Sequence, residues 1–288
     1  MIIANELLNK ERWDQRVLAA QPQGFFFLLS WYLDSVAPNW EGYVVRDYEA
    51  IYPVVPQQKW GVSYTLMPFL TRTFVPIGFS ESETHELSHY LTTRFSYVQL
   101  AGLALNQPNV EHLRRYQSIE LSLAMLEQCS ENHRRQYKKA QNQGFELSSA
   151  IDPAALINLF RQVKGAEFTH LKDADYAMLA RLMEEANQRG VLRQFSLVKH
   201  GELLGAAAYI EVHGQALYLK GAITAEAMKV GGMVFLHLEA MKVLSASCSH
   251  LDFGGSNAKG LGDFNRKFGA RDVEYLLLIM NSLAKPLA

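Results

Sequence analysis

The sequence predicts a mixed protein of the α/β (α+β) kind, made of two halves with similar organisation. Its 288 residues are 49% hydrophobic and 20% charged, which is typical of a globular protein with one large core or two smaller ones. From residue 145 onward, β-forming runs and helically periodic runs follow one another in the order β-α-α-β-β-β-α-β-α-β. The first half alternates in a rougher but parallel way.

The second half opens with a predicted strand, FELSSA (145–150), and two predicted helices. Asp152 and Pro153 start the first helix, because Asp is a favoured cap and Pro fits the first helical position. The second helix, 173–190, has apolar residues at helical spacing and ends in Gly190. Two helices are therefore expected before the sheet continues.

Three β-rich runs come next, and Gly201 and Gly214 separate them as hairpin turns. A helix is predicted from about Gly232 to Ser245. The strand HLDF, a loop, a short helix and a last strand at 274–280 complete the half.

The first half is predicted to hold a helix (ERWDQRVLAA), strands around GYVVRDYE, AIYPVVPQ and VSYTLMPF, a helix at 81–94 and the strand SYVQLAGL. A strand and a polar helix at 111–146 form the joint between the halves. The expected domains are 1–110, a connection at 111–144, and 145–288.

Composition also bounds location and partners. The net charge of −1 gives no overall field that would recruit nucleic acid or an anionic membrane. Cys129 and Cys248 form no CxxC pair, which favours two reduced thiols in a cytoplasmic protein. The N-terminus lacks a secretory pattern, and the most apolar stretch, 25–33, is too short to span a bilayer and is interpreted as a buried strand or helix.

HELSH, from His85 to His89, matches the H-E-x-x-H zinc motif, in which Glu86 would act as a base. Leu87 and Leu91 lie on the apolar stripe of this helix, so both histidines are expected on the opposite, solvent side. No third ligand stands out. We therefore expect no metal site and keep a zinc peptidase only as a remote alternative.

Two glycine-rich turns are candidates for close approach to a ligand. LDFGGSNAKGLGDF (251–264) fits neither the P-loop nor the dinucleotide-binding template. Gly231 and Gly232 are expected where a strand ends and a helix begins, which favours either an anion site at the helix N-terminus or a tight turn that needs glycine.

The run HRRQYKK (133–139) places four cations on two helical turns. Arg134, Arg135, Lys138 and Lys139 would either hold phosphates or lie on a solvated helix, and the sequence leaves both interpretations open.

Three stretches resemble a known family. RRYQSIELSLAMLEQCSENHRRQYKKAQNQGFEL resembles the entry segment of the second domain in Fem-type proteins, HLDFGGS their Tyr-Asp-Phe-Gly-Gly strand end, and GLGDFNRKFGA their Gly-Leu-x-x-Phe-Lys-x-x-Phe-Gly helix. FLLSWYL and MPFLTRTFVPIGF are weaker matches in the first half. The chain thus resembles the GCN5-related N-acetyltransferase (GNAT) superfamily, in its Fem-type or BioF2-like (CelD-like) double-domain branch.

The resemblance implies two tandem GNAT domains, each a mixed, mostly antiparallel sheet flanked by helices. It also implies that the strand carrying Leu251 to Phe253 parts from the preceding strand, so that an acyl donor lies between them. Gly254 and Gly255 would let the chain leave that strand beside the reacting centre.

The implied site residues follow from this placement. The donor phosphates would meet the turn made by Lys229, Val230, Gly231, Gly232 and Met233. The catalytic candidates are Asp252, Asn257 and Lys267, with Ser256 and Asp263 as further polar groups. The substrate-binding candidates are Trp31, Tyr32, Arg46, Tyr64, Tyr218, Lys220 and Phe264.

Two positions depart from the family. Met228 stands where the acetyltransferase loop has Gln or Arg, and Asn265 stands where Fem-type proteins have Lys. The expected function is a cytoplasmic acyltransferase that moves an acyl group from acyl-CoA, a co-substrate and not a tightly bound cofactor, to a small-molecule or peptide amine bound between the two domains. The alternatives are a Fem-type peptidyltransferase that uses aminoacyl-tRNA and an inactive binding protein of the same fold.

Overall fold

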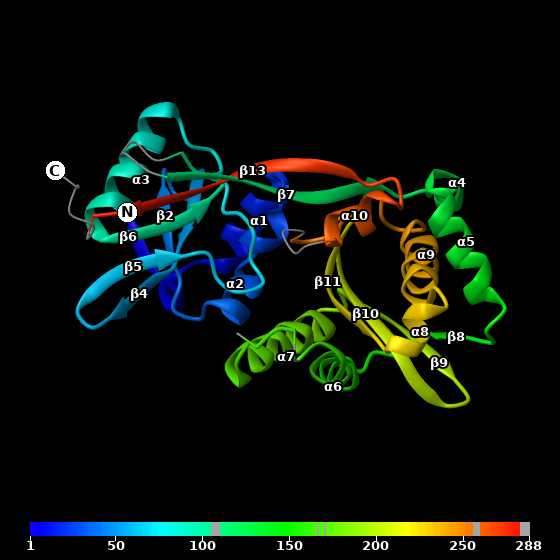
Figure 1. The fold of residues 1–288 in the computed structure, drawn as a ribbon. Helices are drawn as coiled ribbons and strands as arrows, with labels where there is room; N and C mark the ends of the chain where they lie inside the picture. The colour runs from blue at the N-terminus through cyan, green and yellow to red at the C-terminus, as the bar shows by residue number, and fades with distance from the viewer. Residues whose placement is uncertain (105–109, 166, 170, 256–259, 283–288) are drawn as a thin grey trace. The chain divides into compact units, whose positions relative to one another are not determined.

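The computed structural model describes residues 1–104, 110–165, 167–169, 171–255 and 260–282 (Figure 1). The chain divides into two compact units, Met1–Arg114 with Glu274–Ala288, and Arg115–Val273. It passes from one unit to the other within two long strands, β7 (Val110–Glu120) and β13 (Arg271–Asn281). The predicted domain bounds at 110 and 144 stay a prediction.

Unit 1 contains two separate sets of strands, ordered β1-β2-β3 and β4-β5-β6-β13. Its elements are β1 (Ile2–Ala4), η1 (Asn5–Leu7), α1 (Lys10–Ala20), η2 (Phe25–Leu28), α2 (Ser30–Val36), β2 (Glu41–Val45), β3 (Ala50–Val54), β4 (Pro56–Lys59), β5 (Val62–Leu66), α3 (Glu81–Arg94) and β6 (Tyr97–Ala101). The apolar stretch at 25–33 forms η2 and α2 and is buried, as predicted.

Unit 2 carries the strand order β7-β12-β11-β10-β9-β8. Its elements are α4 (Met125–Gln128), α5 (Glu131–Gln141), β8 (Glu146–Ser148), α6 (Pro153–Lys164), α7 (Asp173–Gln188), β9 (Leu192–Lys199), β10 (Glu202–Val212), β11 (Gln215–Ile223), α8 (Ala225–Lys229), α9 (Gly232–Leu244), β12 (His250–Asp252) and α10 (Leu261–Arg266), together with its parts of β7 and β13. This order confirms the predicted fold class.

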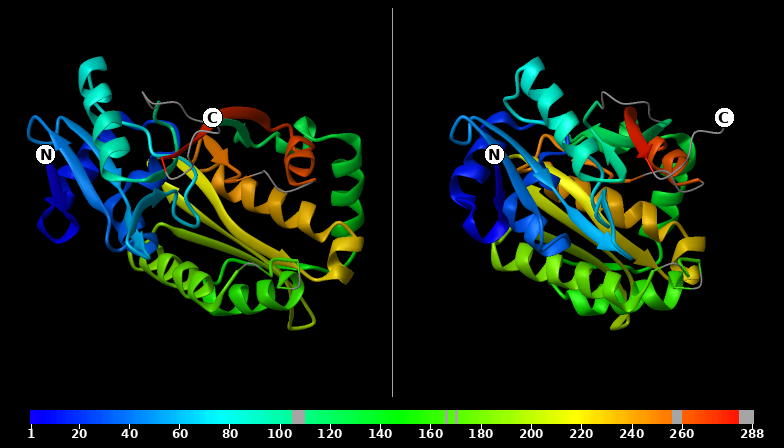
Figure 2. Two further views of the ribbon diagram at one scale, coloured as in Figure 1. Left: turned by 60° about the vertical axis from the view of Figure 1, so that its left-hand side comes forward. Right: turned by 90° about the vertical axis from the view of Figure 1, so that its left-hand side faces the viewer.

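Helices cover both faces of the β9-β10-β11 sheet. Helices α6 and α7 pack on one face and α9 on the other, where α5 packs against α9 (Figures 1 and 2). The start of α6 is fixed as predicted, because the Asp152 side chain accepts a hydrogen bond from the Ala155 N–H and Pro153 takes the first helical position. The main core of unit 2 lies on the α9 face and includes Phe195, Tyr209, Leu236, Leu251 and Phe268.

The connection from β11 to α9 differs from its prediction. A short helix, α8, separates the strand from Gly231, so the glycine turn follows a helix and not a strand. Thr224 caps α8 by accepting a hydrogen bond from the Ala227 N–H, and the sequence AEAMK that follows consists of good helix formers. Local helix propensity therefore overrides the direct turn expected from the glycines.

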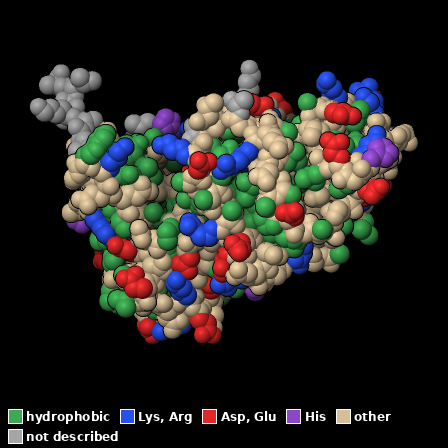
Figure 3. Space-filling model, turned by 90° about the horizontal axis from the view of Figure 1, so that it is seen from below, with side chains coloured by type: hydrophobic (Ala, Val, Ile, Leu, Met, Phe, Trp, Pro, Cys, Tyr) green, Lys and Arg blue, Asp and Glu red, His purple; other side chains and the backbone are tan. Residues whose placement is uncertain are grey.

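No helix within the described residues is both long and apolar enough to cross a membrane. Figure 3 shows acidic and basic side chains interspersed over one face of the molecule, without a large area of one sign. This mixture agrees with the net charge of −1.

Candidate functional site

The strands β11 and β12 part after a short common stretch. They pair in parallel through three residue pairs only, Gln215 with His250, Ala216 with Leu251, and Leu217 with Asp252. In contrast, β10 pairs with β11 along the whole strand, from Gln215 to Ile223. Beyond Leu217, no described strand pairs with the β12 side of β11, which confirms the predicted parting. Backbone groups on such an edge need another partner, and a ligand is one such partner.

A β-bulge in β11 lies directly after Leu217, where the pairing with β12 ends. Ala208 of β10 is opposite Lys220 and Tyr209 is opposite Tyr218, so Leu219 is the extra residue. A bulge changes which face the following side chains point to. Tyr218 accordingly packs on the α9 side, and Lys220 points to the α6 side.

The α9 side of β11 is a closed aromatic group. The Tyr218 ring lies 5.0 Å from His237 and 5.5 Å from Tyr209, and Phe253 and Phe268 complete the surroundings of His237. The Tyr209 hydroxyl and His237 Nδ1 share a hydrogen bond of 2.8 Å. Burial lowers the pKa of His237 to about 3, so the imidazole is neutral at physiological pH. This face is packed core.

The α6 side is different, because it presents an amine to aromatic rings. Lys220 Nζ lies 4.1 Å from the ring centroid of Phe160 and 5.4 Å from that of Phe168. No hydrogen bond or ion pair joins this Nζ to any residue that the structure describes. Burial lowers the pKa of Lys220 to about 8.

The glycine turn and the basic run, which are separate candidates in the sequence, come together at the start of α9. A Cβ on Gly231, whose φ is 87°, would lie 2.4 Å from the carbonyl oxygen of Gln136 on α5, so only glycine fits this approach. Lys139 of the basic run donates a hydrogen bond of 3.1 Å to the carbonyl of Lys229. The tight-turn interpretation is therefore confirmed for Gly231, and the anion site stays a prediction.

The five predicted phosphate-binding residues span this junction. Lys229 ends α8 and is exposed, and Val230 leads into the turn. Gly231 and Gly232 are buried, and Met233, half-buried, takes the second position of α9. The first N–H groups of a helix have no partner within it, which leaves them for another acceptor.

The loop after β12 holds the next candidates. The Asp252 carboxylate accepts a hydrogen bond of 2.8 Å from the Gly254 N–H and so closes the turn. Gly254 needs a left-handed backbone, with φ of 72°, and Gly255 does not. Ser256 and the predicted catalytic residue Asn257 lie outside the described residues.

On α10, Asn265 and Lys267 have different surroundings. Asn265 is buried and donates a hydrogen bond of 3.2 Å to Gln117, which in turn donates to Asp272. Lys267 is exposed, and its side chain makes no hydrogen bond or ion pair with any described residue. Asp263 is exposed and pairs with Arg266.

Phe264 and two aromatic candidates of unit 1 occupy packed positions. Phe264 lies 5.0 Å from the His133 ring and 5.2 Å from Phe268. Trp31 is 5% exposed and Tyr32 is fully buried, with its hydroxyl donating to the Leu70 carbonyl. Tyr64 is half-buried on β5. The structure thus gives Trp31 and Tyr32 core positions, and their predicted contact with substrate stays a prediction.

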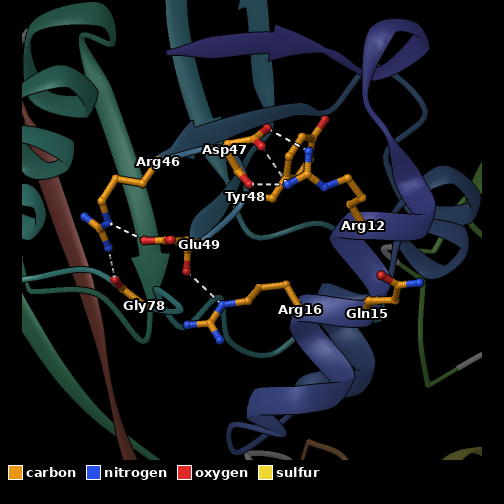
Figure 4. A pocket seen from close by; sticks show the side chains of 8 residues that line it. All are labelled: Arg12, Gln15, Arg16, Arg46, Asp47, Tyr48, Glu49 and Gly78. Atoms are coloured by element: carbon orange, nitrogen blue, oxygen red, sulfur yellow. Dashed lines mark hydrogen bonds and ion pairs between the residues drawn. The ribbon is translucent and has the colours of Figure 1, made fainter.

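Arg46 lines a surface pocket of about 530 Å³ in unit 1 (Figure 4). Its lining residues are Arg12, Gln15, Arg16, Arg46, Asp47, Tyr48, Glu49 and Gly78. Arg46 pairs with Glu49 and Glu83, and Arg12 pairs with Asp47. Arg16 donates to the Glu49 carbonyl. These contacts hold the turn between β2 and β3.

The HELSH segment forms α3, whose bounds match the prediction. His85, Glu86 and His89 are exposed, and Leu87 and Leu91 are fully buried. Ser80 and Glu83 form a capping box at the start of this helix. Among the described residues, no three His, Cys, Asp or Glu side chains gather where they would hold a metal ion.

Sequence reasoning missed Phe160, Phe168 and the bulge at Leu219. Phe160 reads as an ordinary core position of α6, and Phe168 lies in the connection to α7. A bulge leaves no signal in a run of β-forming residues such as QALYLKGAI. Only the fold brings both rings to Lys220.

Comparison with known proteins supports this arrangement. Residues 127–265 match the family model described as an acetyltransferase (GNAT) domain. No curated protein matches the chain.

The solved structures similar to this chain include FemX, with 12% identity and a TM-score of 0.65 over 93% of this chain and 96% of that one. The C-terminal domain of a putative lysylphosphatidylglycerol synthetase from Agrobacterium fabrum has 12% identity and a TM-score of 0.60, over 94% of this chain and 91% of its own. A tandem GNAT protein from the clavulanic acid biosynthesis pathway has 10% identity and a TM-score of 0.57, over 99% of both chains.

Identities this low show a common fold and nothing finer. The predicted resemblance is confirmed at that level: residues 127–265 match the model of a GNAT acetyltransferase domain, and the chain has the fold of FemX and of a tandem GNAT protein.

Proposed function

We propose that the protein is an acyltransferase that moves an acyl group from acyl-CoA to an amine acceptor. The observation that carries the proposal is the parting of β11 from β12 after Leu217 and Asp252. An extended thioester arm fits beside a strand edge whose backbone groups lack a strand partner. The GNAT family match over residues 127–265 supports the same reaction class.

The start of α9 suits the donor phosphates. Helix N-termini favour anions, because their N–H groups and the helix dipole point toward the ligand. Lys229 and Lys139 add two cations at this junction, where Lys139 Nζ donates a hydrogen bond to the carbonyl oxygen of Lys229. We infer that this junction, and not the Gly254–Gly255 turn, meets the pyrophosphate.

The transfer itself can proceed with few catalytic side chains. Backbone N–H groups along Tyr218–Ile223 would donate to the oxyanion of the tetrahedral intermediate, and holding donor and acceptor together would supply much of the rate. In this scheme Asp252 fixes the turn next to the reacting carbonyl through its bond to the Gly254 N–H. Catalytic roles for Asn257 and Lys267, an acceptor between the domains, and a cytoplasmic location stay proposals.

Isothermal titration with acetyl-CoA tests the donor. Lys139→Glu replaces a cation at the α9 junction, and we expect roughly tenfold weaker binding because one phosphate partner is lost and a repulsion is added. Lys138→Glu makes the same charge change at the next, exposed position, about 100° around α5, and should change affinity less than twofold. Equal affinities for both variants would place the phosphates elsewhere.

The likeness to FemX keeps an aminoacyl-tRNA donor as the second candidate. Its signature would be a salt-dependent complex with aminoacyl-tRNA together with no heat of binding for acetyl-CoA. An inactive binding protein is the third, motivated by Met228, which is exposed on α8, and by Asn265, which is engaged with Gln117. That protein would bind a donor without any turnover.

A further inference from the structure

Lys220 stands directly beyond the point where the two strands part. It lies three residues after Leu217, the last residue of β11 that pairs with β12. The bulge at Leu219 turns its side chain away from the closed aromatic group around His237 and toward Phe160 and Phe168. Its amine is therefore next to the edge where the proposed thioester would lie.

Among the described residues, the surroundings of this amine are apolar and offer it no counter-ion. Lys242, a half-buried lysine on α9, is in contrast paired with Glu239 and with the Tyr137 hydroxyl. Lys220 Nζ has ring contacts but no hydrogen bond or ion pair among the residues described. Keeping an amine there costs folding free energy, and such groups concentrate at functional sites.

Burial is the only cause that lowers the pKa of Lys220 to about 8. The charged and titratable groups on the elements packed against β11 are Arg161 and Lys164 on α6, each paired with an acid, Glu202, Tyr209 and Glu211 on β10, His250 and Asp252 on β12, and His237, Glu239 and Lys242 on α9.

We propose that Lys220 is the general base of the acyl transfer, taking the proton from the acceptor amine at Nζ. This inference rests on the proposed function. It extends the role of Lys220 from lining the donor slot to moving a proton, and it places the acceptor amine on the α6 side of β11, beside Phe160 and Phe168.

The proton balance is simple. The neutral Nζ removes one proton from the acceptor ammonium, and the freed amine attacks the thioester carbonyl carbon. The tetrahedral intermediate loses its second N–H proton to solvent as the C–S bond breaks and the new C–N bond remains. The CoA thiolate leaves and takes the proton held on Nζ, so the products are an amide, CoA–SH and one released proton.

Two other roles fit less well. As a nucleophile, Lys220 would form an acyl-lysine amide, which is as stable as the product amide and would not pass the group on. As an anion-binding cation, it would need to stay charged, and burial with no acid beside it among the described residues disfavours the charged form. A base that is neutral near physiological pH is what these surroundings favour.

The test compares Lys220→Arg with Lys220→Met, using acetyl-CoA as donor and a primary alkylamine as acceptor, which is an ammonium at pH 7 and must lose a proton before it can attack. Arginine keeps a cation over the rings but cannot give up its proton, and methionine keeps the apolar packing. We expect both variants to lose about a hundredfold or more in kcat while their affinity for acetyl-CoA changes less than threefold. The log of kcat/KM for the wild type should rise with pH to a plateau, with a midpoint near 8, and the variants should lack this step.

Competitive labelling of the full chain with trace acetic anhydride, read by mass spectrometry, reports on the amine without turnover. Lys220 should become reactive at lower pH than the exposed Lys138, whose side chain serves as the internal reference. Retained turnover in Lys220→Arg, or equal labelling midpoints for the two lysines, overturns the inference while the acyltransferase stands. A wild-type chain that neither binds nor transfers from acetyl-CoA overturns the proposed function and this inference with it.

Discussion

The two faces of β11 differ in whether their buried polar side chains have hydrogen-bond partners. On the α9 face, the hydroxyl of Tyr209 and the imidazole of His237 satisfy each other within a closed aromatic core. On the α6 face, only two residues after Tyr218, the amine of Lys220 meets two phenyl rings and no acid among the described residues. One bulge separates the two environments.

The α9 face therefore stabilises the fold, and our proposal gives the α6 face a role in acyl transfer. A satisfied buried pair adds to stability, whereas an unpartnered amine lowers it and is retained for another reason.

Truncation should affect the two faces very differently. His237→Ala leaves a cavity among Tyr209, Tyr218 and Phe253 and removes a hydrogen-bond partner, so we expect a loss of about 3 kcal/mol in unfolding free energy. Lys220→Met replaces a desolvated amine with an apolar chain and should cost less than about 0.5 kcal/mol. Urea unfolding measures the loss of unfolding free energy in both variants. Equal losses would show that the two faces of β11 contribute equally to stability.

Acid should weaken the α9 face. Burial lowers the pKa of His237 to about 3 and that of His133 to about 4, whereas both would titrate near the ordinary value, about 6.5, in the unfolded chain. The unfolded state therefore binds more protons below pH 6.5, and stability is lost as the pH falls toward these values. Between pH 7 and 5.5 the loss should be about 1 kcal/mol for each histidine.

His237→Gln keeps an amide beside the Tyr209 hydroxyl and cannot titrate in this range. Its unfolding free energy should show roughly half of the wild-type pH dependence. A variant with the full wild-type dependence would show that His237 is not buried as a neutral group.

The end of β12 offers a matched pair of glycines. A side chain on Gly254 meets the Tyr218 carbonyl and a left-handed backbone, so Gly254→Ala should cost about 1 to 2 kcal/mol. A Cβ on Gly255 meets no atom within 4 Å, and Gly255→Ala should change stability by less than about 0.5 kcal/mol. Reversed effects in thermal unfolding would mean that the chain leaves β12 differently.

The smallest effects are expected outside both faces, on α3. His85→Ala and His89→Ala remove exposed side chains, so each should change unfolding free energy by less than about 0.5 kcal/mol. Metal analysis of the wild type and of His89→Ala tests whether α3 binds a metal ion. A stoichiometric metal that disappears with His89 would restore the zinc alternative.

Much of the fold was predictable because its signals are local. The cap at Asp152, the helical spacing in 173–190 and the glycines between β-rich runs each indicate an element without reference to the rest of the chain. The helix α8 was not predicted because the two glycines after it favour a turn directly after the strand. Thr224 and AEAMK nevertheless have the cap and the composition of a helix.

The candidate site was predictable only where a family motif marks it. The parting of the strands followed from the resemblance and the glycine turn from Gly231 and Gly232 themselves, but the rings around Lys220 depend on how α6 packs on β11. Neither that packing nor the bulge at Leu219 has a periodic signature. The isolation of the Lys220 amine therefore appears only in three dimensions.

A crystal structure with bound acetyl-CoA, or with an analogue that cannot transfer its acyl group, would locate the donor on unit 2. We expect the pyrophosphate at the first N–H groups of α9, near Lys139 and Lys229, and the acyl carbonyl at the edge of β11 between Tyr218 and Lys220. A donor bound away from β11, or side chains filling the space beside β11 beyond the end of β12, would show that β11 does not hold the donor.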